Sequence, residues 1–244
     1  MFLTKIFKKC VQNTETLYLC TSKILPLEQS QKAKVQFYSE SEERINIWSH
    51  FIGIILSCIA TIALVSKSFD FESSLPLVSF LIYGFSMMTL YTASTLYHKS
   101  TDIEKRFRLK ILDHASIYLF IAGTYTPYCL ISMMGNGGWT VFAIVWSIAL
   151  IGIIFKIFFT GKFKIFSTLL YVAMGWIIVF SYSSLKAGLN ENGRFWLFAG
   201  GIAYTIGAIL YSIKKINYNH AIFHVFVLLG SIFHFISIYN YINP

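Results

Sequence analysis

The sequence is poor in charge, in proline and in cysteine. Only 13% of its 244 residues are Asp, Glu, Lys or Arg, against about 25% in a typical soluble domain. This scarcity excludes an intrinsically disordered chain and a coiled coil, and four cysteines are too few for a disulfide scaffold. Apolar types instead make up 56% of the residues, and the mean hydropathy is +0.62. A soluble domain of this size has too little interior for so much apolar surface, so we expect lipid to be the remaining solvent.

Acidic residues are fewer than basic ones, 11 against 20, which gives a net charge of +9. In a soluble protein that excess would favour nucleic acid as the partner. Here the basic residues lie between apolar stretches, which is typical of residues that set membrane topology and contact anionic head groups. We therefore expect membrane lipids as partners and no nucleic acid. The cysteines show no pairing or metal-site spacing: Cys10, Cys20, Cys58 and Cys129.

The chain contains seven long apolar stretches. Each is long enough, as a helix, to cross about 30 Å of hydrocarbon. Barrel strands would need alternation of apolar and polar residues, which is absent. The sequence therefore predicts an all-α polytopic membrane protein, a bundle of seven transmembrane helices. The stretches are 46–66, 76–98, 111–133, 139–159, 165–185, 195–213 and 220–242.

The residues before this bundle, 1–45, form a polar N-terminal segment, and residues 46–242 form the transmembrane domain. The first fourteen residues contain Lys5, Lys8 and Lys9 but no apolar run of the kind that a signal peptide needs. The lack of arginine among them disfavours an organelle-targeting presequence. We expect this segment to be a cytoplasmic tail.

The distribution of Lys and Arg predicts the orientation. Seven basic residues precede the first stretch. Ten more lie in the second–third, fourth–fifth and sixth–seventh connections or, for Lys156, in the last turn of the stretch before one. The opposite side has only Lys67, Lys186 and Arg194. The positive-inside rule then places the N-terminus in the cytoplasm and the C-terminus on the extracytoplasmic side, and we expect the plasma membrane of the cell.

Ionisable groups inside apolar helices are expensive and need a reason. The only acid in the seven stretches is Asp113, and all six histidines also lie there. With the predicted topology, Asp113 and five histidines fall at one depth near the cytoplasmic face, and only His234 falls in the outer half. The five are His50, His98, His114, His220 and His224.

His220 and His224 have the i, i+4 spacing that places two imidazoles on one helix face, within reach of one metal ion. His98 as a third ligand would leave one tetrahedral position open, which is the arrangement of catalytic zinc (Zn²⁺). Asp113 would then hold or deprotonate a water, and Ser94, one turn before His98, would bond the water or a substrate carbonyl. Histidines at helix ends also often lie simply at head-group level, and packing explains His50 and His234 equally well.

Five motifs give this pattern a family resemblance. They are Glu43–His50 (ERINIWSH), Ser94–His98 (STLYH), Asp113-His114 with Ile121–Pro127 (IAGTYTP), Met174–Trp176 (MGW) and His220–Ser231 (HAIFHVFVLLGS). In this order they resemble the haemolysin III family, relatives of the progestin and adipoQ receptors and more distantly of alkaline ceramidases.

The resemblance implies seven helices with a cytoplasmic N-terminus and zinc near the inner face, held by His98, His220 and His224. It also implies a water-holding aspartate at Asp113 and a site serine at Ser94. Glu43, Asn46 and His50 match a motif whose role does not follow from the residues; we expect it to brace the inner helix ends.

Three functions follow from these expectations. The first is a zinc-dependent hydrolase of lipid amides, such as ceramide-like lipids. The second is a pore-forming haemolysin or cytolysin, which needs a polar path through outer helix halves that are mostly apolar. The third is a receptor-like regulator of membrane lipid composition with structural zinc. A fourth protein ligand, His50 or His114, would indicate a closed structural site.

Overall fold

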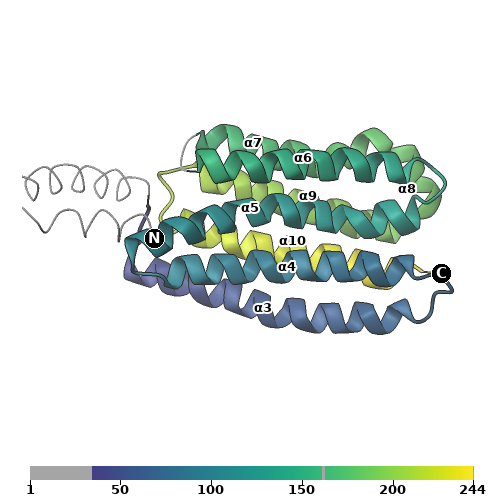
Figure 1. The fold of residues 1–244 in the computed structure, drawn as a ribbon, viewed down its shortest axis with the longest axis horizontal. Coiled ribbons are helices and arrows are strands. Elements are labelled where there is room, and N and C mark those ends of the chain that lie inside the picture. Colours follow the sequence, from purple (N-terminus) through teal and green to yellow (C-terminus); the bar gives the residue numbers. More distant parts are fainter. Residues whose placement is uncertain (1–34, 161–162, 244) are drawn as a thin grey trace, which may run out of the picture.

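The computed structural model describes residues 35–160 and 163–243, and all regular structure in these residues is helical. The predicted N-terminal tail therefore lies largely outside the described residues. The helices run side by side along the long axis of one bundle (Figure 1). The longest are α3 (Glu40–Ser68), α4 (Leu75–Lys99), α5 (Ile103–Pro127), α6 (Gly138–Phe159), α9 (Glu191–Ser212) and α10 (Asn219–Tyr241).

Helix α3 begins before residue 46, inside the segment that we assigned to the polar tail. The side chain of Ser39 accepts the backbone N–H of Glu42, and three acidic residues occupy the first turn. A capping serine and acidic residues both stabilise a helix N-terminus. The helix therefore starts with a polar turn, whereas the hydropathy of the sequence marks only where its apolar part begins.

Six segments are long and apolar enough to cross a membrane. They are α3, α4, α6, α9, α10 and the segment Ile165–Gly188. Helix α5 differs because its first two turns are rich in charged residues, yet it lies alongside α4 and α6 in the bundle (Figure 1). The architecture is thus a polytopic helical bundle, and α5 as a seventh crossing stays a prediction.

The stretch 165–185 forms a broken helix and not the continuous one that we expected. It consists of α7 (Lys164–Gly175), the 3-10 turn η2 (Ile177–Ser181) and α8 (Tyr182–Gly188). At the break, the hydroxyl of Tyr125 on α5 donates to the carbonyls of Met174 and Gly175, at 3.1 and 2.7 Å, and accepts the N–H of Ile178 at 2.9 Å. A side chain from another helix thus satisfies backbone groups that the break leaves without helical partners.

The outside of the bundle is apolar and the interior contains polar groups. Phe180 is 91% exposed and Ile62 71%, whereas histidines, serines and tyrosines are buried. Small residues let the helices approach closely, as at Gly53, where a Cβ would meet the ring of Tyr91 at 2.5 Å. This inverted distribution is that of a protein whose surrounding solvent is lipid.

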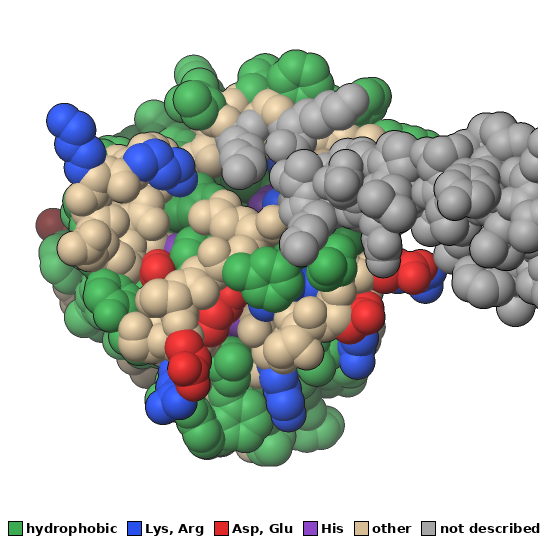
Figure 2. Space-filling view, turned by 90° about the vertical axis from the view of Figure 1, so that its left-hand side faces the viewer, with side chains coloured by type: hydrophobic (Ala, Val, Ile, Leu, Met, Phe, Trp, Pro, Cys, Tyr) green, Lys and Arg blue, Asp and Glu red, His purple; other side chains and the backbone are tan. Residues whose placement is uncertain are grey.

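The two ends of the bundle differ in charge. At one end, called the site end, α3, α5, α7 and α10 begin and α4, α6 and α9 finish. Lys, Arg, Asp and Glu side chains gather around this end, as Figure 2 shows. The C-terminus lies at the opposite end, the far end (Figure 1), where Lys67, Lys186 and Arg194 are the basic residues.

Candidate metal centre

Three histidines from two helices converge at the site end. His98 lies in the last turn of α4, and His220 and His224 lie in the first turns of α10. Nε2 of His220 lies 3.0 Å from Nε2 of His98 and 3.1 Å from Nε2 of His224. Two nitrogens that each lie about 2.0–2.1 Å from a tetrahedral zinc are separated by about 3.3 Å. The three buried imidazoles therefore form a group that can hold a metal ion.

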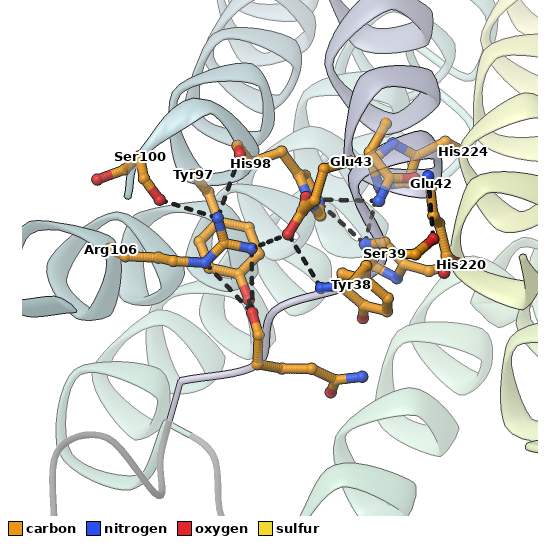
Figure 3. Close-up of polar contacts among 12 residues, drawn as sticks. Tyr38, Ser39, Glu42, Glu43, Tyr97, His98, Ser100, Arg106, His220 and His224 are labelled. Atoms are coloured by element: carbon orange, nitrogen blue, oxygen red, sulfur yellow. Dashed lines mark hydrogen bonds and ion pairs between the residues drawn. The ribbon is translucent and has the colours of Figure 1, made fainter. Parts of the chain in front are cut away.

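Helix α3 fixes the orientation of His98. Nδ1 of His98 donates to Oε2 of Glu43 at 2.6 Å (Figure 3). Nδ2 of Asn46 lies 3.4 Å from the same nitrogen. Because the carboxylate can only accept, the proton of the neutral ring sits on Nδ1 and Nε2 is free to bind a metal. A carboxylate behind a ligating histidine is a common feature of metal sites, where it fixes the ring and raises its basicity.

Arg106 holds Glu43 in turn. Its side chain is 2% exposed. The guanidinium pairs with the other carboxylate oxygen of Glu43 and donates to the carbonyls of His98 and Ser100, at 3.1 and 2.9 Å (Figure 3). It also donates to the carbonyl of Gln36. Buried charges need such complete pairing. This cluster ties α3, α4, α5 and the segment before α3 together beside the metal centre.

The segment before α3 covers the histidines. The ring of Tyr38 stacks on His220 with centroids 4.6 Å apart and an interplanar angle of 12°. Its backbone N–H donates to Glu43 at 3.2 Å. Burial raises the pKa of the Tyr38 phenol well above its usual range, so the ring stays neutral. Tyr38 thus closes the site end of the centre with an uncharged aromatic face.

His50 and His114, the candidates for a fourth ligand, do not join the group. His50 stacks on His224 with centroids 3.6 Å apart and an interplanar angle of 8°, so it forms a wall of the site. Nδ1 of His114 lies 3.0 Å from Oδ2 of Asp113. Among residues 35–160 and 163–243, no fourth His, Cys, Asp or Glu offers an atom to the three-histidine group.

A cavity of about 200 Å³ leads from this centre into the bundle. His220, His224, Asp113 and Ser94 all contribute to its walls, and most of the other lining residues are apolar. The hydroxyl of Ser94 is buried and has no protein hydrogen-bond partner among the described residues. Asp113 and Ser94 therefore share a cavity with two of the three histidines, while their chemical roles stay predictions.

His234 lies apart from this group, in the far half of α10. Its Nε2 lies 3.1 Å from the carbonyl oxygen of Leu197, and its ring packs directly against Gly200. A carbonyl only accepts, so Nε2 carries the proton. His234 is thus a packing and hydrogen-bonding residue that also contributes to the inner cavity wall.

From the sequence we expected Glu43, Asn46 and His50 only to brace the inner helix ends, and we assigned no role to Arg106 or Tyr38. Glu43, Asn46 and His50 recur at the i, i+3 and i+7 positions of one helix face, which is the signal that could have placed them together. Arg106 and Tyr38 lie outside the seven predicted apolar stretches, and nothing in their spacing indicates that they are buried beside the histidines.

The chain is similar to known proteins over most of its length. The family model described as "Haemolysin-III related" matches residues 38–235. "Hemolysin-3" of Bacillus cereus is 46% identical over 205 residues, which cover 83% of this chain and 93% of that protein. "Hemolysin-3 homolog" of Bacillus subtilis (strain 168) is 45% identical, covering 80% and 91%. The human "Monocyte to macrophage differentiation factor" is 25% identical, covering 82% and 84%.

Proposed function

The chain belongs to the haemolysin-III related family and is a multi-pass integral membrane protein, and we propose that it is a zinc-dependent hydrolase of lipid amides. One observation carries the proposal: three imidazoles converge beside a largely apolar cavity, and no fourth ligand among the described residues closes the group. An open position is typical of catalytic zinc, whereas structural zinc sites have four protein ligands.

The donor set suits zinc. Three neutral imidazole nitrogens are a common zinc ligand set, and Glu43 supplies the carboxylate that orients one of them. When bound, zinc supplies a Lewis acid that polarises a carbonyl and makes water more acidic. The same centre without an open position would serve structure alone, as in a receptor-like regulator, and it would then need a fourth ligand.

Residues of the chain would complete the chemistry. Hydrolysis of an amide adds the hydroxyl of water to the acyl carbon and its proton to the leaving nitrogen. Asp113 accepts the proton from the attacking water and passes it to that nitrogen. Ser94, whose hydroxyl is buried in the cavity wall, donates a hydrogen bond to the carbonyl oxygen.

The cavity has the length and character that an acyl chain needs. It extends along α10 from His224 to His234, which are ten residues or about 15 Å apart on a helix. Between them its walls include Ile117, Phe120 and Val227. Apolar walls beside one polar end suit an amphiphilic lipid.

We further propose that the site end faces the cytoplasm of the cell and that the protein lies in the plasma membrane. The support is the excess of basic residues at this end of the bundle. A cysteine placed at Lys214 should then be protected from an impermeant thiol reagent in intact cells, and one at Lys186 should react.

Purified protein tests the hydrolase directly. Zinc-loaded wild type should release fatty acid from a long-chain ceramide or another N-acyl lipid, and His224→Ala should fall to background. Equal release by both proteins, or no release from any long-chain amide, contradicts the proposal. Size-exclusion profiles of both proteins control for folding.

The name "Hemolysin-3" of the Bacillus cereus relative favours membrane damage as a second candidate. It predicts that the pure protein releases a small dye from liposomes whether or not zinc is removed. Dye retention together with amide hydrolysis separates the two functions in favour of the enzyme.

A further inference from the structure

Two lysines are buried on the side of the cavity formed by α5, α6 and α7. Lys156, near the end of α6, is 2% exposed, and Lys110, near the start of α5, is 4% exposed. Lysine near the end of a membrane helix ordinarily extends its ammonium group to the head-group region. Full burial of a lysine is rare unless its charge has a partner, so the contacts of Lys156 decide whether its charge is met within the chain.

The contacts of Lys156 leave room for an anion. Its ammonium nitrogen donates to Oγ of Ser167 at 2.6 Å and lies 5.7 Å from the centre of the Tyr171 ring. The ion pairs formed among the described residues do not include Lys156. An ammonium group has three donors, and one hydroxyl satisfies one of them.

Both lysines line the cavity that leads to the metal centre, and so do the hydroxyl residues Ser167 and Thr168. Lys110 precedes Asp113 by three residues, so on the helix the two side chains are neighbours, with Cβ atoms about 5–6 Å apart. Farther along the same face of α5, Ile117 and Ile121 line the cavity. From the site end inward, the cavity is therefore lined first by the lysines, then by Asp113 at the level of the metal centre, and then by apolar side chains.

This order defines a ligand. We propose that Lys110, Lys156 and Ser167 bind the anionic head group, carboxylate or phosphate, of a single-chain amphiphile whose chain extends into the cavity. Oxygens of such a head group accept charge-assisted hydrogen bonds from both ammonium groups. The carboxylate of Asp113, one turn from Lys110, has a contact of its own, because Nδ1 of His114 lies 3.0 Å from its Oδ2.

Binding at this site does not require hydrolysis. Its consequence for the substrate rests on the proposed function: the lipid amide would carry a carboxylate or phosphate beside the amide, as an N-acyl amino acid does, and would not be neutral like ceramide.

Binding of four probes to the full chain in detergent tests the site: dodecyl phosphate, dodecanoate, dodecanol and inorganic phosphate. Zinc-loaded and metal-stripped protein are both measured, because an anion can also bind a metal. We expect the two charged amphiphiles to bind at least about tenfold tighter than dodecanol in both forms. Lys156→Gln and Lys110→Gln should remove this preference, Lys156→Arg should keep it, and Lys186→Gln at the far end is the matched control.

Three results overturn the proposal. Equal affinity for dodecanol and dodecyl phosphate shows that no anion site exists. A preference that disappears with the metal and ignores Lys156→Gln assigns the anion to the metal. Inorganic phosphate that binds as tightly as dodecyl phosphate shows that no acyl chain is involved. None of these binding measurements depends on amide hydrolysis. They therefore test the anion site even if the protein does not hydrolyse amides.

Discussion

His224 and His234 lie on the same helix, both are buried, and they behave differently. At the site end, His224 lies 3.1 Å from His220 and forms part of a group of three open nitrogens. In the far half, His234 is protonated on the nitrogen that faces the carbonyl of Leu197, and its ring packs against Gly200. A buried histidine in a membrane helix is thus no metal ligand by itself. The groups around its two ring nitrogens decide whether it can bind a metal.

The same contrast holds for the other polar groups of the two halves. At the site end, Glu43 and Arg106 form a network that crosses three helices and ends on a histidine. In the far half, polar groups pair between two helices at a time: Nε1 of Trp146 donates to the hydroxyl of Thr126 at 3.2 Å, and Ser237 donates to the carbonyl of Gly193 at 2.7 Å. The first pattern orients a site, and the second joins neighbouring helices.

The largest effect should come from Arg106→Gln, which leaves the partly buried carboxylate of Glu43 without its cation. We expect a loss of about 3–5 kcal/mol in the free energy of unfolding. Thermal or SDS unfolding of the pure protein measures it. Arg44→Gln, which removes an exposed pair with Glu40, is the control and should cost less than about 1 kcal/mol. Similar losses for both variants would remove the distinction between network and surface pair.

Glu43→Gln should act on the metal more than on the fold. An amide cannot hold the ring of His98 as strongly as a carboxylate, so zinc affinity should fall by about ten- to a hundredfold. Competition with a chelator of known affinity measures it, and Glu40→Gln is the exposed control on the same helix. Unchanged affinity in Glu43→Gln would mean that α3 braces the helices without tuning the centre.

Gly200→Ala tests the structural role of His234. A Cβ at this position would overlap the ring of His234, whereas at Gly201 the nearest atom would be 3.7 Å away. We expect Gly200→Ala to lower the free energy of unfolding by about 1–3 kcal/mol and to leave bound zinc in place. Gly201→Ala should be close to neutral. Loss of zinc in Gly200→Ala would show that packing around His234 affects the metal centre, and it would contradict a purely structural role for His234.

Much of the fold and of the metal centre could be predicted from the sequence. Helix lengths follow from apolar stretches, and the i, i+4 pair of α10 with His98 follows from helical spacing and depth. The break after Gly175 could not be predicted, because the side chain that satisfies its free backbone groups, Tyr125, comes from another helix. The stacking of His50 and Tyr38 on the ligand rings also depends on distant segments. The roles of Asp113 and Ser94, and the membrane orientation, stay predictions.

Metal content tests the central claim most directly. Wild type, His98→Ala and His234→Gln are purified in parallel, and zinc per chain is measured by elemental analysis. If His98, His220 and His224 hold one ion, wild type and His234→Gln contain about one zinc per chain and His98→Ala contains almost none. Zinc that persists in His98→Ala, or a wild type that binds no metal under any loading condition, would contradict it.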